Sequence, residues 1–571
     1  MNKKILSLIV IVFYTSFINL YSQNSIAIDC FKVGDYDLAK KYLEANTSVN
    51  SAETYYYLGE VSFAQGNIDV AKDYYNRGIS CDKDYLFNNI GLLKIALKNN
   101  TNEALSSIVS FQNKYKDNLD VLIAIGYAYI DNNMLDEASK ILNNVMKLDN
   151  KNPSVYIFEG DLLKMNQKYG ESAAKYDMAI YFEPNCLLAY LKGALIYEYS
   201  NWQTSIGKLK EILKLQPDYF LAYRYLGKIY TSNGYYSSAI NAFNTLIATG
   251  YYTLDDVRRY VTALYFNNQY EEANKWIKEG LTINPTDFVL NRLKMYVASD
   301  LHNYEEGLTY AETFFSLKRQ KDDKYLAKDY QIYAGMLKNV KMYDQAFDEY
   351  QKAISLDSNY LDIYKELASL MSNKGEYGYA GDFYQQYIDK VGDKVEAMDF
   401  FQLGKYFYNA GNVRCKNDTI RILNLQNQHS FIDLLSDNER QKDSLRDNSM
   451  FFLRKAVHYY LNRANSSFDS LINRIPMGYT GYLWKARTNS LFDPESELGL
   501  AKPFYEKTIE ILLAKTETNN SSKEALIEAY SYLGYFYYLK VDKNNTLLFW
   551  NKVLELDPNN VNAKTVLKTM K

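Results

Sequence analysis

The sequence predicts an all-α fold, a right-handed solenoid of antiparallel helix pairs. A small residue returns every 32–39 residues, most often after 34, through most of the 571-residue chain. Apolar residues around it are spaced as on one face of a helix, and the whole chain has only 8 prolines. A period of this length and regularity is typical of stacked helix pairs, in which each repeat contacts mainly its neighbours. The repeating position is occupied in turn by Gly59, Gly91, Gly126, Gly160, Gly193, Gly227, Val261, Met295, Ala334, Ala368 and Gly404.

Residues 221–250 show one complete repeat. A first helix is expected over 222–230, and Asn233-Gly234 then breaks it, because glycine readily adopts the left-handed turn that ends helices. A second helix follows, with Ala239 and Phe243 on its inner face. Gly227 and Ala239 are small because we expect the two helices to cross there, where an added side chain would overpack the contact.

The first 22 residues predict a secretory signal peptide. Lys3 and Lys4 precede a mostly apolar run over 5–20, and Ser22 before Gln23 offers a small residue at the cleavage point. The alternative is an uncleaved anchor helix, but the run is shorter than the roughly 20 apolar residues that a spanning helix needs. No later segment is apolar enough to cross a bilayer, so we expect the mature chain to be exported without a transmembrane span.

The repeats resemble the tetratricopeptide repeat. Residues 193–217, 226–243 and 533–558 carry the fullest copies: an aromatic residue, Leu-Gly and Tyr in the first helix, then Gly-x-Tyr, Ala, an aromatic residue and a terminal Pro. The resemblance implies about 11–12 repeats over 23–411 and further repeats over 451–571. The copies near Gly91 and Met295 depart most from the pattern. The leader ending Tyr-Ser-Gln and the composition rich in Asn, Lys and Tyr resemble envelope proteins of Bacteroidota.

A polar segment, 412–450, interrupts the rhythm between two paired helices. It is rich in Asn and Asp, and insertions in repeat proteins map to loops on one face. Long loops of this kind are either functional or disordered, and both interpretations stay open. At the other end, 559–571 predicts a polar helix that caps the last repeat.

Reactive groups are few. No Cys forms a C-x-x-C pair, and none of His302, His429 and His458 has the spacing of a helical metal site. Phosphate-binding and nucleophile-turn motifs are absent, so we expect no enzyme, no cofactor and no metal. Cys30 and Cys81 are the only pair that could form a disulfide, and burial as apolar groups is the alternative. A formal net charge of −3 does not fit a nucleic-acid binder.

The resemblance implies that the first helix of each pair lines a concave groove. Cations recur three residues before the small position and one residue after it, and tyrosines lie close by. Arginine suits carboxylates and tyrosine offers rigid contact area, so this surface would suit an extended acidic or C-terminal peptide. Local pairing with Asp218, Asp255 and Asp256 is the alternative. The candidate partner-binding residues are Arg224, Lys228, Arg258, Tyr265, Arg292, Tyr296, Lys365, Lys405 and Tyr408.

These observations favour a non-enzymatic scaffold that binds protein partners in the cell envelope. The expected location is the periplasm, either free or associated with the outer membrane. A solenoid whose tyrosines stack on cell-wall glycans is the second hypothesis. An enzyme that uses Cys415 and His429 of the insertion is the third, and the spacing of those residues supplies no third catalytic group.

Overall fold

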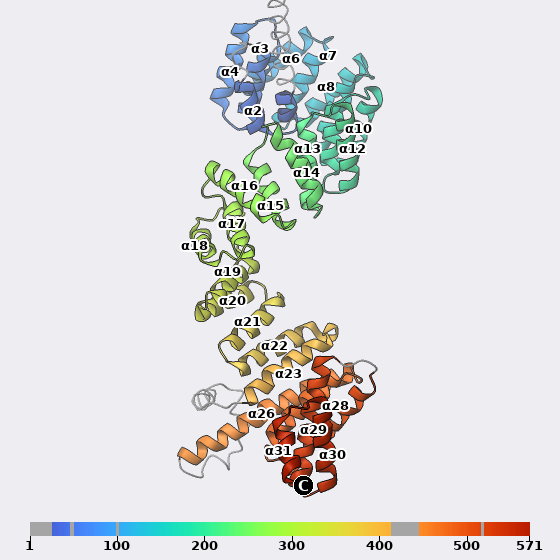
Figure 1. Cartoon of the computed structure of the whole chain (residues 1–571). Coiled ribbons are helices and arrows are strands. Elements are labelled where there is room, and N and C mark those ends of the chain that lie inside the picture. Colours follow the sequence, from blue (N-terminus) through green and yellow to red (C-terminus); the bar gives the residue numbers. More distant parts are fainter. Residues whose placement is uncertain (1–25, 46–50, 99–101, 413–444, 516–518, 571) are drawn as a thin grey trace, which may run out of the picture. The chain divides into compact units, whose positions relative to one another are not determined.

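The computed structural model describes residues 26–45, 51–98, 102–412, 445–515 and 519–570, and those ranges are helical with short turns and no strand (Figure 1). This confirms the all-α repeat fold. The chain divides into two compact units, Met1–Val297 and Ala298–Lys571. The predicted signal peptide and the part of the insertion from 413 to 444 lie outside the described residues.

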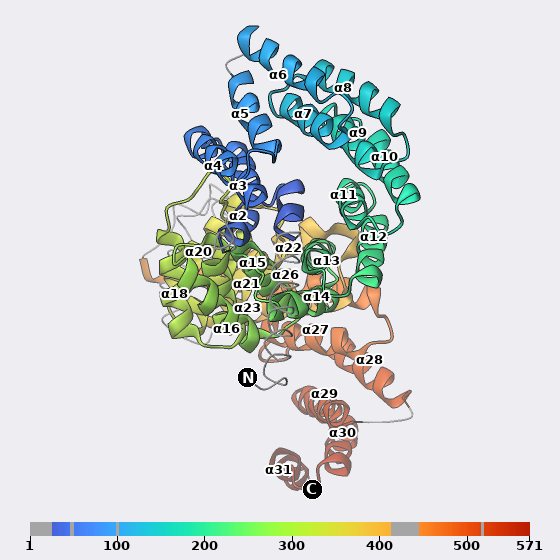
Figure 2. The ribbon, with the colours of Figure 1, turned by 90° about the horizontal axis from the view of Figure 1, so that it is seen from above.

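Unit 1 begins with a short helix at 26–32, which pairs with α2; we call residues 26–45 the N-terminal hairpin. From there, first and second helices alternate, and Figure 2 shows the pairs following one arc. The helices are α2 (Tyr36–Ala45), α3 (Ala52–Ala64), α4 (Ile68–Cys81), α5 (Phe87–Leu97), α6 (Asn102–Lys114), α7 (Leu119–Asp131), α8 (Leu135–Leu148), α9 (Pro153–Met165), α10 (Tyr169–Phe182), α11 (Leu187–Tyr197), α12 (Trp202–Leu215), α13 (Phe220–Ser232), α14 (Tyr236–Ala248), α15 (Leu254–Phe266), α16 (Tyr270–Ile283) and α17 (Phe288–Asp300), within which the unit ends.

The recurring small residue has a physical cause in the packing of each pair. A Cβ atom at Gly227 would lie 2.7 Å from the ring of Phe243, and one at Gly160 would lie 2.6 Å from the ring of Tyr176. Both rings are buried, so they cannot move aside without opening the core. In the next repeat after Gly227 the two positions hold Val261 and Ile277, both fully buried. A larger first-helix residue therefore accompanies a smaller second-helix residue.

The turns within the pairs confirm the predicted helix break. Gly234 has a φ of 78°, the left-handed region in which a Cβ is unfavourable. Three asparagine or glutamine residues take the same conformation in other pairs, with φ of 60° at Asn133, 61° at Gln167 and 59° at Asn268. Asparagine tolerates this region better than most residues.

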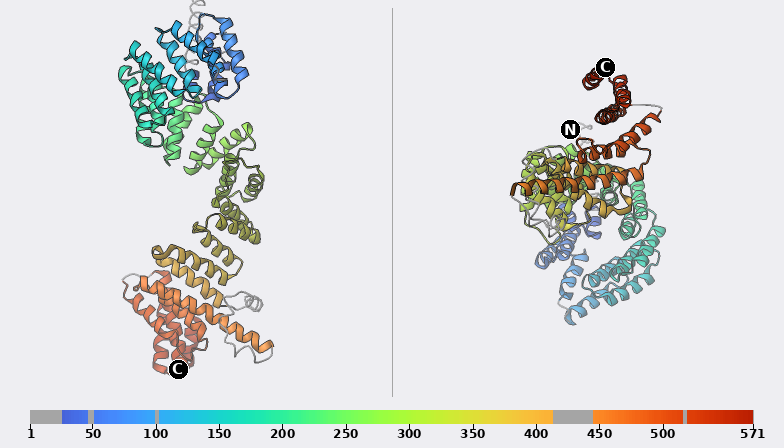
Figure 3. Two further views of the ribbon diagram at one scale, coloured as in Figure 1. Left: turned by 180° about the vertical axis from the view of Figure 1, so that it is seen from behind. Right: turned by 90° about the horizontal axis from the view of Figure 1, so that it is seen from below.

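Unit 2 continues the alternation. Figure 3 shows its long helix α26 as the extended orange segment. The helices are α18 (Tyr304–Ser316), α19 (Ala327–Asn339), α20 (Tyr343–Leu356), α21 (Asp362–Asn373), α22 (Tyr377–Val391), η1 (Gly392–Lys394), α23 (Ala397–Gly411), α26 (Leu445–Arg474), α27 (Tyr479–Phe492), α28 (Lys502–Leu513), α29 (Asn520–Leu539), α30 (Lys543–Leu556) and α31 (Val561–Thr569).

Helix α26 is longer than the sequence predicts. It begins at Leu445, inside the segment expected to be an insertion, and ends at Arg474. Its second half carries the core: a Cβ at Gly404 of α23 would clash with the ring of Phe468, which is fully buried. Phe468 therefore fills, for α23, the place that Phe243 fills for α13.

Buried tyrosines and the buried thiol of Cys30 belong to the core. Tyr176, Tyr350 and Tyr384 of the second helices are at most 7% exposed and belong to the core. Cys30 is buried and Cys81 is exposed, and both are free thiols. The Cys30–Cys81 disulfide is therefore not formed in this structure.

Candidate functional site

Buried ion pairs join the first helices of consecutive repeats in unit 1. The ammonium of Lys94 on α5 lies 2.7 Å from the carboxylate of Glu60 on α3 and 3.0 Å from that of Asp131 on α7. Tyr75 donates a hydrogen bond of 2.6 Å to Glu60. Burial alone would lower the pKa of Lys94, but the two carboxylates outweigh it and raise that pKa. Lys94 is therefore charged and fixes the register of three repeats.

A second node lies two repeats further along the chain. Asp161 on α9 accepts hydrogen bonds of 2.7 Å from the hydroxyls of Tyr127 and Tyr176. Lys192 on α11 lies 2.9 Å from the same carboxylate. Lys192 also donates to the main-chain carbonyl of Lys32, which belongs to the N-terminal hairpin. A residue 160 positions away thus lies against α11.

The N-terminal hairpin lies against the first helices α11 and α13. Tyr219, at the start of α13, donates a hydrogen bond of 2.8 Å to Asp29. The guanidinium of Arg224 on α13 pairs with Asp35. The ring of Tyr42 packs edge-on against Tyr251 at a centroid distance of 4.7 Å. The first repeat of the chain therefore occupies the first-helix surface of repeats far along the sequence.

Arg224 and Arg258 make local pairs. Arg224 is 7% exposed and bonds both oxygens of Asp256, with its Nη2 at 2.8 Å. Arg258 donates from Nε to Asp287 at 2.7 Å. Arg224 therefore pairs with Asp256, as the alternative of local pairing expects, and also with Asp35 of the hairpin. Arg258 pairs mainly with Asp287 of the next repeat, a carboxylate that the alternative did not name.

The other predicted residues of unit 1 are also in contact with the chain. Lys228 lies 2.7 Å from Glu198, and the guanidinium of Arg292 lies 4.9 Å from the ring centre of Phe288. Tyr265 and Tyr296 are 6% and 4% exposed, with ring centres 5.7 Å apart. The two tyrosine side chains are therefore buried in the core and offer little surface to a partner.

In unit 2 the structure brings two of the predicted residues together around Trp484. The ring of Tyr408 stands 5.2 Å from that of Trp484, and the ammonium of Lys405 lies 5.8 Å from it. Among the described residues, no carboxylate pairs with Lys405. Lys365 lies elsewhere, 3.3 Å from Asp399 and 4.1 Å from the ring centre of Tyr387. Lys405 is the cation of the predicted set that is best placed to meet a partner.

The sequence analysis did not identify the carboxylates that pair with cations on the first helices of unit 1. Glu60 and Asp161 each follow a small residue directly, at the register position where we looked for cations. Charged residues on otherwise apolar helix faces are the signal that would have found them, because buried charges are paired. Asp29 and Asp35 of the hairpin carried no such signal, since their partners are about 190 residues away.

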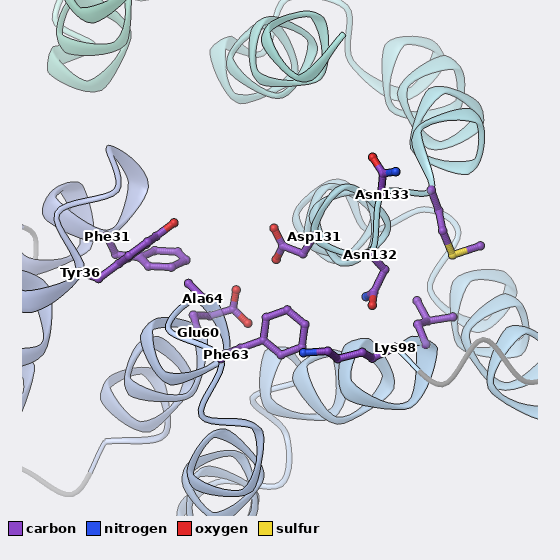
Figure 4. A pocket seen from close by; sticks show the side chains of 12 residues that line it. Phe31, Tyr36, Glu60, Phe63, Ala64, Lys98, Asp131, Asn132 and Asn133 are labelled. Carbon is purple, nitrogen blue, oxygen red and sulfur yellow. The ribbon is translucent and has the colours of Figure 1, made fainter. Parts of the chain in front are cut away.

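A cavity of about 620 Å³ lies beside the Lys94 network. Figure 4 shows the side chains of the N-terminal hairpin, α3, α5 and α7 around it. Within the described ranges, no three His, Cys, Asp or Glu side chains are placed to hold a metal ion. None of the helices described is both long and apolar enough to cross a membrane.

Family models for the tetratricopeptide repeat match residues 26–85 and 119–152. A TPR repeat-containing protein of Methanocaldococcus jannaschii is 21% identical over 398 residues, which are 65% of this chain and 64% of that protein. The chain thus spans somewhat less than two thirds of that curated relative.

Two solved structures are also similar. The C-terminal part of a TPR repeat-containing protein from Cytophaga hutchinsonii is 25% identical, with a TM-score of 0.39, and covers 54% of this chain and 98% of its own. A tetratricopeptide repeat protein from Parabacteroides merdae is 18% identical, with a TM-score of 0.30, covering 45% and 99%. The family models thus identify tetratricopeptide repeats at residues 26–85 and 119–152 of this chain.

Proposed function

We propose that this chain is a non-enzymatic scaffold that binds protein partners on its first-helix surface. One observation carries the proposal. In unit 1 that surface already holds a polypeptide segment, the N-terminal hairpin, through a carboxylate on Arg224 and a carbonyl on Lys192, and a ring of the hairpin also packs on Tyr251 in the turn before α15. A surface that binds a segment of its own chain by such contacts has the chemistry to bind a partner's segment.

The proposal places the partner contact of unit 2 at Lys405 and Trp484. Lys405 brings a positive charge without a carboxylate partner in the described residues, and Trp484 and Tyr408 bring aromatic contact area. Tryptophan, tyrosine and cations concentrate the binding energy of many interfaces. A segment with a carboxylate next to an apolar side chain fits this arrangement.

A photoreactive amino acid at Lys405 tests this proposal in the native host. The full chain carries the probe at Lys405 or, as a control, at Lys352 of the second helix α20, whose side chain is 56% exposed. We expect a discrete protein adduct from position 405 that is absent from position 352. The same adducts from both positions, or none from 405, would reject a first-helix binding surface.

The location belongs to the same proposal. The pattern of 1–22 supports export, and we propose that the scaffold works in the periplasm or at the outer membrane, within an envelope complex. N-terminal sequencing of the protein purified from its host measures this, and Gln23 is the expected first residue. An intact Met1 on the mature protein would contradict cleavage.

A further inference from the structure

The cavity in unit 1 is lined by groups from four parts of the chain: the N-terminal hairpin, α3, the end of α5 and the end of α7. The N-terminal hairpin contributes Phe31 and Tyr36, α3 contributes Phe63, and α7 ends at the cavity with Asp131, followed by Asn133. In Figure 4 these side chains surround one open space. Since the hairpin closes one side, the cavity exists because of the contacts that hold the hairpin against α11 and α13.

Several polar groups of the cavity wall have hydrogen-bonding capacity to spare. Asp131 uses Oδ2 for Lys94, and its Oδ1 has no partner among the described residues. The Tyr36 hydroxyl and the Asn133 side-chain amide make no hydrogen bond within the described part of the chain. Asn132 donates both its bonds to main-chain carbonyls, of Lys94 and Ala128, and its Oδ1 is left to accept. The wall therefore offers donors and acceptors together.

The aromatic rings supply flat apolar walls. Phe31 and Tyr36 lie with ring centres 6.0 Å apart on the hairpin, and Phe63 lies on α3 beneath the ammonium of Lys94, 4.4 Å from its ring centre. All three rings are partly exposed. Ring faces beside a few placed polar groups are the usual composition of small-molecule sites.

The charge of the cavity selects the class of ligand. Glu60 and Asp131 carry two negative charges, and Lys94 and Lys98 carry two positive charges, with Lys94 held between the carboxylates. A cationic ligand would be repelled by Lys98, and an anionic ligand would be repelled by Asp131. A neutral ligand avoids both repulsions, and it can use the unpaired donors and acceptors.

We propose that this cavity binds a short neutral saccharide, whose hydroxyls meet Tyr36, Asp131 and Asn133 and whose apolar ring faces stack on Phe31 or Phe63. The volume of about 620 Å³ lies inside the range of about 300–1,000 Å³ common for such sites. The proposal concerns unit 1 only, and it does not depend on the protein contact at Lys405.

An array of neutral oligosaccharides, including maltotriose, cellotriose and the N-acetylglucosamine trimer, tests the proposal on the full-length chain. Saturation-transfer NMR identifies the binder and calorimetry gives its affinity. We expect millimolar or tighter binding that is unchanged between low and high salt, because no ion pair forms. Absence of binding to every member of the array would overturn the proposal.

Two matched variants locate the site. Asn133→Gly removes the amide at a φ of 60°, where glycine is not strained, and Asn268→Gly makes the same change at a φ of 59° in a turn outside the cavity. Losing a hydrogen bond of about 1 kcal/mol weakens the affinity by roughly five- to tenfold for Asn133→Gly, with no change for Asn268→Gly. Equal affinities of the two variants, or binding of a lysine-rich peptide in place of the saccharide, would overturn the assignment.

Discussion

At the scale of single residues, buried ion pairs fix how consecutive repeats align. Lys94 is 2% exposed and is bonded to the first helices before and after its own. Buried ion pairs seldom add net stability over a well-packed apolar core, but breaking one is costly. Their role here is to define which helix faces meet.

Lys94→Met tests that role. The variant leaves Glu60 buried without its cation and is expected to cost about 3–5 kcal/mol, seen as faster amide hydrogen exchange in α3 and α5. Adding Glu60→Gln removes the stranded charge and keeps an acceptor for Tyr75, so most of the protection returns. Unchanged exchange in the single variant would show that the pair is dispensable.

Asp29 predicts an unusual pH dependence. Burial raises its pKa, and the hydrogen bond from Tyr219 only partly lowers it. The folded state then binds a proton more tightly than the unfolded state, so ionised Asp29 costs stability at neutral pH and that cost falls as the pH drops through the folded pKa. Asp29→Asn, which can still accept from Tyr219, should be at least as stable as the wild type at pH 7, with an advantage that shrinks on acidification.

Thermal unfolding at pH 7 and at mildly acidic pH measures this, with the exposed Asp117→Asn as control. If Asp29→Asn lowered the stability at pH 7 as strongly as the loss of an ion pair does, the account would be contradicted.

At the scale of helices, the fold depends on volume exchanged within each pair. Gly227 and Phe243 in one repeat correspond to Val261 and Ile277 in the next, and Phe243, Val261 and Ile277 are fully buried. The number of side-chain carbon atoms is thus the same in the two pairs while their distribution changes, which cores tolerate well.

Gly227→Val should overpack against Phe243 and cost about 1–3 kcal/mol. The double variant Gly227→Val/Phe243→Ile reproduces the natural pair of the following repeat and should recover most of that loss. Exchange protection of α13 and α14 is the measurement. A double variant no more stable than the single one would refute compensation within the pair.

The N-terminal hairpin is the element whose position depends on distant contacts. Asp35→Arg opposes Arg224, which keeps Asp256 as its partner, so exchange of residues 26–45 should rise while α13 stays protected. Lys41→Glu, a charge reversal at an exposed position of α2, is the control. Equal exchange in the two variants would mean that the Asp35–Arg224 pair does not hold the hairpin.

At the scale of the whole chain, the sequence predicted the repeat and its helices because both rest on local spacing. The 34-residue period, the Gly–aromatic pairing and the Gly234 turn all agree with the structure. The binding face was predicted less well. The pairing of Arg224 with Asp256 was one of the two interpretations of the sequence. The partners Asp287 of Arg258 and Asp35 of Arg224 were not identified, because they lie 29 and 189 residues away and leave no local pattern. The limits of α26 were also missed, since its first turns lie in a polar stretch.

Crosslinking mass spectrometry of the purified full chain tests most directly whether the first-helix surface holds a polypeptide segment. The ammonium of Lys192 lies 2.9 Å from the main-chain carbonyl oxygen of Lys32, so an amine-reactive crosslinker should join these two lysines within one molecule. A mixture of isotopically light and heavy protein distinguishes links within one molecule from links between molecules. A Lys32 that links only to its sequence neighbours Lys40 and Lys41, or links to Lys192 only between molecules, would contradict the account.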